Sequence, residues 1–195
     1  MRLPDLSPEQ MTPRQRELSD RITKRRGHTR GPYVAWLHSP GMADPAEALA
    51  AYARYECSLS RKLREFSILI TARFWDAQYS WNSHVGKAVE AGIDAETVRA
   101  IAEKRRPQFK AEDERVFFAF SMEMLEQHFV SDETYRAAQA MFGNEGLVDI
   151  VGCIGNFSML AMLLNTFQVD LQPGAVPPFP DVSGFGKTST IERET

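Results

Sequence analysis

Residues 60–92 read SRKLREFSILITARFWDAQYSWNSHVGKAVEAG. Ser60 is a good N-cap, and the apolar residues after it wrap most of the circumference of a helix from 61 to 75, which predicts a central, buried helix. Asp76 is expected to cap a second helix, which ends where Gly92 supplies the left-handed conformation of a C′ residue. Two consecutive helices therefore occupy the middle of the chain.

Helix signals recur on both sides of this stretch, and no alternating strand pattern of useful length is present, so the sequence predicts an all-α fold. We expect one domain over residues 31–170, an N-terminal helical extension over 1–30, and an extended or disordered tail over 171–195. Residues 31–40, rich in aromatic residues and bracketed by helix breakers, are expected to form a buried connector. The other predicted helices cover residues 13–25, 44–57, 94–106, 112–128, 131–143 and 145–169.

Composition and charge limit the possible partners. The chain has 195 residues, 43% of them hydrophobic and 25% charged, which is ordinary for a soluble globular domain. A net charge of −3 gives no reason to expect nucleic acid or an anionic membrane as a partner. The N-terminus lacks the apolar run of a secretory signal, and no uninterrupted apolar stretch is long enough to cross a bilayer. We therefore expect a cytoplasmic protein.

The two cysteines, Cys57 and Cys153, lie far apart in the sequence. They form no Cys-X-X-Cys pair, and two cysteines supply neither a disulfide framework nor a four-ligand zinc site. The histidines show no spacing typical of metal ligands, so no metal site is expected.

Glu65 and His84 are the candidate catalytic residues. Glu65 has apolar neighbours on its predicted helix, so burial is expected to raise its pKa, and an unperturbed histidine titrates near neutral pH. Together they indicate acid/base chemistry. Two simpler interpretations stay open: Glu65 forms an i, i+4 ion pair with Arg61, and His84 is a structural histidine.

These residues belong to a pattern that resembles the carboxymuconolactone decarboxylase family, whose relatives include the AhpD-type alkylhydroperoxidases. The resemblance covers most of the chain, and the spacing of Glu65 and His84 is its most specific part. It implies an AhpD-like helical bundle that works as a homo-oligomer, a dimer, trimer or hexamer, with active sites near subunit contacts. The apolar character of residues 145–169 on several sides agrees with burial between subunits. The matching elements are Leu63-Arg64-Glu65, Tyr79-x-Trp81-x-x-His84, Ala91-Gly92-Ile93 and Asn165-Thr166-Phe167.

One departure separates the two chemistries of that family. Its peroxidase branch carries cysteines seven and four residues before the histidine, where this chain has Ala77 and Ser80. A serine hydroxyl forms neither a sulfenic acid nor a disulfide, so thiol peroxidase activity is disfavoured at this site. Cys57 or Cys153 could restore that activity only by lying beside His84.

The resemblance thus predicts a cofactor-independent enzyme that decarboxylates or isomerises a small carboxylated lactone from aromatic degradation. Glu65 and His84 would share a proton network, with the assignment of the proton donor left open. Tyr79 and Trp81 are expected to bind the substrate ring, although both are equally well explained as core or subunit-contact residues. The substrate carboxylate is expected to bind Arg61, Arg73 or a residue of a neighbouring subunit. The alternatives are a non-catalytic oligomeric binding protein and an AhpD-like thiol peroxidase.

Overall fold

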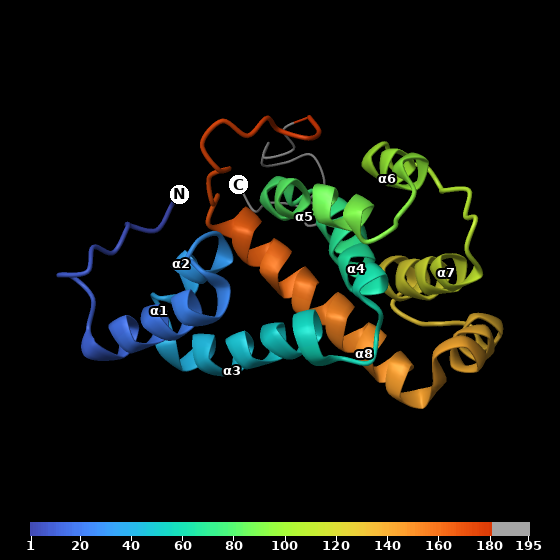
Figure 1. Cartoon of the computed structure of the whole chain (residues 1–195), viewed down its shortest axis with the longest axis horizontal. Helices are drawn as coiled ribbons and strands as arrows, with labels where there is room; N and C mark the ends of the chain where they lie inside the picture. Colours follow the sequence, from blue (N-terminus) through green and yellow to red (C-terminus); the bar gives the residue numbers. More distant parts are fainter. Residues whose placement is uncertain (181–195) are drawn as a thin grey trace, which may run out of the picture.

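The computed structural model describes residues 1–180, which form eight α-helices, one π-helical turn and no strand (Figure 1). The predicted all-α class is therefore confirmed. The elements are α1 (Pro13–Arg26), α2 (Pro32–Trp36), α3 (Pro40–Ala51), the π-helical turn η1 (Tyr52–Glu56), α4 (Arg61–Phe74), α5 (Gln78–Glu90), α6 (Ala95–Ala102), α7 (Glu112–Gln127) and α8 (Asp132–Thr166).

Helix α4 lies at the centre of the bundle, as the sequence predicted. The Ser60 hydroxyl caps it by accepting a hydrogen bond from the Leu63 backbone N–H. The helix packs against α5, α6, α7 and α8, which leaves almost no side open to solvent. Phe66 and Leu69 are fully buried in it, and burying a side chain of this size contributes roughly 1.5–3 kcal/mol. This packing fixes the position of Glu65 on the same helix.

Helix α8 is two predicted helices joined at a kink. Gly143 has a φ of 66° and a ψ of −179°, and the helix changes direction there (Figure 1). In length and composition α8 could cross a membrane, but 61% of its most apolar window is buried inside the bundle. Burial of this kind is typical of a core helix. The cytoplasmic location stays a prediction.

Two predicted helix starts are wrong. Helix α3 begins at Pro40 instead of Asp44, so Pro45 lies inside the helix, and the end of the predicted helix is wound as the π-helical turn η1. Asp76 does not cap α5: its φ is 52°, and its carboxylate pairs with Arg73 and Lys104 instead. The N-cap of α5 is Ala77, which has no side-chain cap.

Both ends of the described chain pack near the end of α8. The Met1 amino group pairs with Asp170 at 2.7 Å. Residues 171–180 contain no helix, but they are held against α5, where the Phe179 ring packs edge-on against Trp81 with 5.8 Å between centroids. The rest of the predicted 171–195 tail, from 181 to 195, lies outside the described residues, and the predicted domain boundaries stay predictions.

Candidate active site

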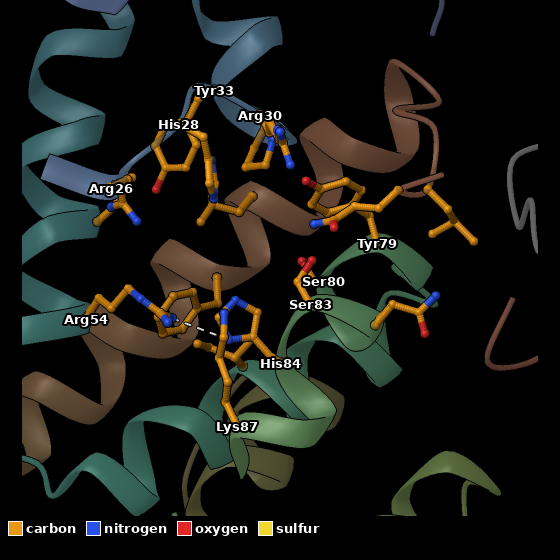
Figure 2. A pocket seen from close by; sticks show the side chains of 18 of the residues that line it. Arg26, His28, Arg30, Tyr33, Arg54, Tyr79, Ser80, Ser83, His84 and Lys87 are labelled. Atoms are coloured by element: carbon orange, nitrogen blue, oxygen red, sulfur yellow. Dashed lines mark hydrogen bonds between the residues drawn. The ribbon is translucent and has the colours of Figure 1, made fainter. Parts of the chain in front are cut away.

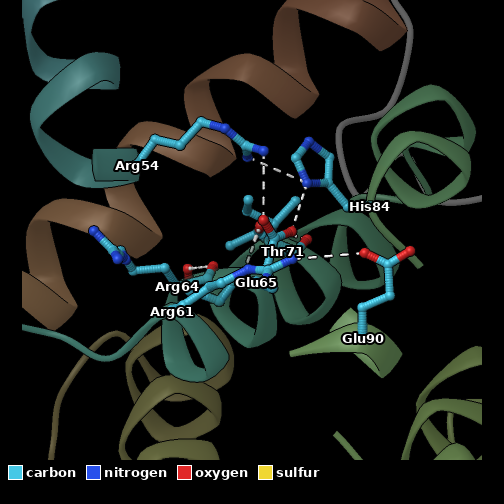
Figure 3. A network of polar contacts seen from close by, with 9 residues as sticks. Arg54, Arg61, Arg64, Glu65, Thr71, His84 and Glu90 are labelled. Carbon is cyan, nitrogen blue, oxygen red and sulfur yellow. Dashed lines mark hydrogen bonds and ion pairs between the residues drawn. The ribbon is translucent and has the colours of Figure 1, made fainter. Parts of the chain in front are cut away.

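Glu65 and His84 meet between α4 and α5. Glu65 Oε2 and His84 Nδ1 are 2.7 Å apart, although the two residues are separated by nineteen positions in the sequence (Figure 3). Both side chains are largely buried, with 8% of Glu65 and 17% of His84 exposed. The structure therefore brings the two candidate catalytic residues into direct contact.

Arg54 from η1 completes this cluster. Its Nη2 lies 3.4 Å from Glu65 Oε1 and its Nη1 lies 3.3 Å from His84 Nδ1 (Figure 3). The predicted alternative, an ion pair between Glu65 and Arg61, is wrong: Arg61 pairs with Glu90 at 3.6 Å on the surface. Arg54 was not predicted, because it lies in a π-helical turn that no capping residue or proline marks in the sequence.

The charges around the pair set its protonation state. Burial raises the pKa of Glu65, but the hydrogen bond from His84 and the positive charges of Arg54 and Lys87 outweigh it, so the pKa lies below its ordinary value. This corrects the predicted upward shift. Burial also lowers the pKa of His84, and Arg54 and Lys87 act in the same direction against the opposing effect of Glu65. At neutral pH the pair is therefore an ionised carboxylate and a neutral imidazole.

This protonation state selects one tautomer. An ionised carboxylate only accepts hydrogen bonds, so the proton shared at 2.7 Å belongs to His84 Nδ1, which donates to Glu65. The 3.3 Å contact of Arg54 with the same nitrogen is then a van der Waals approach of two N–H groups and not a hydrogen bond. The other ring nitrogen, Nε2, carries a free lone pair and is the atom that can exchange a proton with a bound molecule.

His84 lies in the wall of a cavity of about 450 Å³ (Figure 2). Glu65 is not among the residues that line this cavity, so it lies behind the imidazole. Helices α4, α5 and α8, the η1 turn and the segment after α1 all contribute to the wall. A cavity of this size suits a small organic molecule.

Positive charge dominates the cavity wall. Four cations, Arg26, Arg30, Arg54 and Lys87, line it together with His28 and His84, and none of its described lining residues is Asp or Glu (Figure 2). The predicted carboxylate ligands, Arg61 and Arg73, are not among them. Arg73 instead pairs with Asp76 and donates to the Ala102 carbonyl.

Arg26 has unused hydrogen-bonding capacity. Its side chain is only 9% exposed, and its Nε and one Nη atom are buried without a hydrogen-bond partner among the described residues. The guanidinium stacks over the Tyr33 ring at 4.4 Å, while Glu47 is 4.0 Å away. Because an unsatisfied buried donor is costly, these atoms favour an acceptor supplied by a ligand.

Tyr79 and Trp81 have different surroundings. Tyr79 lines the cavity, packed so tightly on Gly31 that a Cβ atom there would lie 2.5 Å from its ring. Trp81 is 3% exposed, belongs to the hydrophobic core and does not line the cavity. The geometry therefore supports a substrate contact for Tyr79 but gives no support to the one predicted for Trp81.

The segment after α8 closes one side of the cavity. Leu171, Gln172 and Ala175 line it, and the Asn82 side chain holds this segment by donating to the Val176 carbonyl at 2.9 Å. Sequence reasoning missed this role, because a segment rich in proline and glycine carries no periodicity that shows what it packs against.

No thiol lies in the wall of the cavity. Ala77 is buried and Ser80 lines the cavity at the two positions where the peroxidase branch would place cysteines. Cys57 and Cys153 are not lining residues. Instead they contact each other in the interior, with 3.9 Å between the sulfur atoms, although they lie far apart in the sequence. In residues 1–180, no three His, Cys, Asp or Glu side chains gather as a metal site requires.

No protein-family model matches the chain, and no curated protein sequence matches it. Solved structures do. An uncharacterized peroxidase-related protein from Ralstonia eutropha JMP134, described as an alkylhydroperoxidase AhpD core, has a TM-score of 0.73 and 15% identity over 88% of this chain and 92% of its own. A peroxidase-related protein from Silicibacter sp. TM1040 has a TM-score of 0.71 and 15% identity over 89% and 91%.

A third solved structure, from Agrobacterium tumefaciens, is a protein of unknown function named as an AhpD-type antioxidant defence protein. Its TM-score is 0.59, with 17% identity over 71% of this chain and 95% of its own. At such identities the likeness concerns the backbone alone, since function depends on particular site residues. The chain has the AhpD-like fold.

Proposed function

We propose that this protein is a cofactor-independent acid/base enzyme that acts on a small carboxylated substrate. The observation that carries this proposal is that His84 lines the cavity and contacts Glu65 behind it. The charged residues that line this cavity are all cationic. The finer assignment, decarboxylation or isomerisation of a carboxylated lactone, rests on the resemblance to the carboxymuconolactone decarboxylases.

The charges favour an anion in the cavity. Arg54 and Lys87 lie beside His84, and Arg26 and Arg30 lie farther from it along the cavity wall (Figure 2). Four cations around one cavity fit an anionic molecule. The guanidinium of Arg26 is suited to a carboxylate, which can accept two parallel hydrogen bonds from one guanidinium.

Decarboxylation at this site would need only proton transfer and charge stabilisation. When the bond between carbon and the departing carboxylate breaks, its electron pair moves through the adjacent C=C bond into the lactone carbonyl. Arg54 and Lys87 would stabilise the resulting dienolate oxygen. His84 Nε2 would take a proton from water and deliver it to carbon, while Glu65 stabilises the transient imidazolium and the hydroxide left by water combines with the released carbon dioxide to give bicarbonate. In this scheme His84 is the catalytic residue and Glu65 is a positioning residue.

The test is loss of ultraviolet absorbance of 4-carboxymuconolactone on incubation with the wild-type protein. His84→Ala is expected to lower kcat by ~10²- to 10⁴-fold, the usual contribution of general acid/base catalysis. Arg54→Gln and Lys87→Gln are expected to raise KM. Arg61→Gln is the matched control, because Arg61 is 62% exposed and lies outside the cavity wall. Absence of turnover, or turnover that is equal in His84→Ala, would overturn the decarboxylase assignment.

A peroxidase reaction at His84 is the activity that the names of the structural relatives suggest. It would require a thiol beside His84, and Ala77 and Ser80 occupy the relevant positions. A hydroxyl cannot be oxidised and resolved as a thiol can. We therefore favour acid/base chemistry over a peroxidase reaction as the function of this site.

The protein is also proposed to associate with a second copy of itself through α8. Val148, Val151 and Met162 are 72%, 48% and 42% exposed, and they recur on one side of the helix. Gly152 and Gly155 lie between them, and a Cβ atom added to either would meet nothing within 4 Å. An uncharged, apolar helix face with small residues at its centre suits close packing against the same helix of a second chain.

A further inference from the structure

Cys57 and Cys153 form a pair that the proposed acid/base reaction does not use. Cys57 follows directly after η1, Cys153 lies in α8, and their sulfur atoms are 3.9 Å apart. Both thiols also lie near one acceptor, the Ala53 carbonyl, at 3.4 and 3.6 Å. We propose that these two thiols are a redox site, oxidised by hydrogen peroxide to an intramolecular disulfide.

Neighbouring contacts hold the two cysteines in register. Asp149 lies one turn before Cys153 on α8 and accepts hydrogen bonds from both the backbone N–H and the hydroxyl of Ser58, at 2.7 and 2.6 Å. The Tyr52 hydroxyl donates to the same carboxylate at 2.9 Å. The segment that carries Cys57 is therefore fastened to α8 on one side of the sulfur pair.

The sulfur atoms need only a short movement to bond. A disulfide requires about 2.05 Å between the sulfur atoms, which is shorter than the present 3.9 Å. Cys57 lies at the end of a π-helical turn, and such turns are frequent at functional sites. Cys57 also lies just beneath the surface, because its neighbours Glu56 and Ser58 are exposed. A molecule as small as hydrogen peroxide is suited to reach it.

The surroundings make Cys57 the attacking thiol. The hydrogen bond from Cys153 lowers the pKa of Cys57 to about 7, against the effect of burial. The same contact and burial raise the pKa of Cys153. Arg64 on α4 lowers the pKa of both thiols, and Asp149 on α8 raises it. The nucleophile in thiol oxidation is the thiolate, so Cys57 should react first.

The reaction balances with peroxide as the oxidant. The Cys57 thiolate attacks one peroxide oxygen, the O–O bond breaks, and the leaving hydroxide takes a proton to become water. The sulfenic acid on Cys57 is then attacked by Cys153, which loses its proton as the second water leaves. Two thiols lose two electrons in total, and hydrogen peroxide is reduced to two molecules of water.

The primary test uses the wild-type chain, so it does not depend on whether a variant folds. Reduced protein is treated with hydrogen peroxide, denatured in acid, alkylated and analysed by mass spectrometry. We expect a monomer that has lost two hydrogen atoms, resists alkylation, yields a peptide pair linked through Cys57 and Cys153, and reverts with dithiothreitol. Two alkylatable thiols after treatment, a sulfinic acid without a cross-link, or disulfides only between chains would each overturn the proposal.

Variants then assign the roles and separate this site from the cavity. Cys153→Ser should trap the sulfenic acid on Cys57, where dimedone labels it, whereas Cys57→Ser should leave Cys153 unlabelled. The reverse labelling would overturn the assignment of Cys57 as the attacking thiol. His84→Ala should form the disulfide at the wild-type rate, since His84 does not contact either cysteine. A loss of disulfide formation in His84→Ala would instead place the oxidation at the cavity.

Discussion

Arg54 Nη2 lies 3.4 Å from Glu65 Oε1, so a cation from the η1 turn is in contact with the buried carboxylate of α4. Because Arg54 also contacts His84, it affects the pKa of both members of the pair in the same direction. Arg54 also lines the cavity. One side chain therefore both influences the protonation state of Glu65 and His84 and offers positive charge to a ligand.

Two substitutions should therefore move the titration of His84 in opposite directions. Arg54→Gln removes a charge that lowers the pKa of His84, so that pKa should rise. Glu65→Gln removes a charge that raises it, so the pKa should fall further. The measurement is NMR titration of the imidazole, assigned by comparison with His84→Ala. Arg61→Gln is the control and should leave the titration unchanged, while a shift in the same direction in both variants would contradict the arrangement.

The local parts of the fold could be predicted from the sequence. Ser60 caps the helix that it was expected to cap, and Thr12, Asp94 and Ser131 cap helices that start close to the predicted positions, because capping depends on a residue and its next few neighbours. Pro45 is an exception, since a proline of the kind typical of a first turn is tolerated inside α3, which starts at Pro40.

Half of the candidate site could be predicted and half could not. Glu65 and His84 lie on two consecutive helices that pack against each other, so a contact between them could be expected from their spacing in the sequence. Arg54 and the segment from 171 to 175 reach the cavity only through the packing of distant elements. The contact of Cys57 with Cys153 likewise depends on how η1 lies against α8, which no short-range pattern encodes.

Acidification should destabilise the protein through the same pair. Folding lowers the pKa of Glu65 below its ordinary value of 4.5. Glu65 therefore stabilises the folded state at pH values above 4.5, and this stabilisation is lost as the pH falls through the pKa of the folded state. The pKa of His84 is also lowered in the folded state, from an ordinary value of 6.5. Below pH 6.5 the unfolded chain therefore binds the proton more readily, and unfolding is favoured. Urea unfolding from about pH 7 to about pH 4 should show falling stability. His84→Ala should flatten the upper part of this decline, and an unchanged slope would contradict it.

The α8 face makes a prediction about assembly. The wild-type chain, of 22.1 kDa, should elute in size-exclusion chromatography as more than one copy at micromolar concentration. Val148→Asp places a charge in the centre of the proposed contact and should yield a monomer, because an unpaired charge is costly to bury. Phe129→Asp is the control, since Phe129 is 83% exposed and lies outside α8. A monomeric wild type would rule out this contact.

Gly31 should prove necessary for the position of Tyr79. Its φ is +63°, and an added Cβ would lie 2.5 Å from the Tyr79 ring, so Gly31→Ala must both strain the backbone and displace the ring from the cavity wall. Gly27→Ala is a matched control, because Gly27 has a φ of +81° but nothing within 4 Å of its Cβ position. A residue held in such a conformation costs about 1–3 kcal/mol. In urea unfolding both variants should lose stability, with the larger loss in Gly31→Ala, and only Gly31→Ala should also raise the KM for the carboxylated substrate. Equal losses of stability with an unchanged KM would show that the contact between Gly31 and Tyr79 does not shape the site.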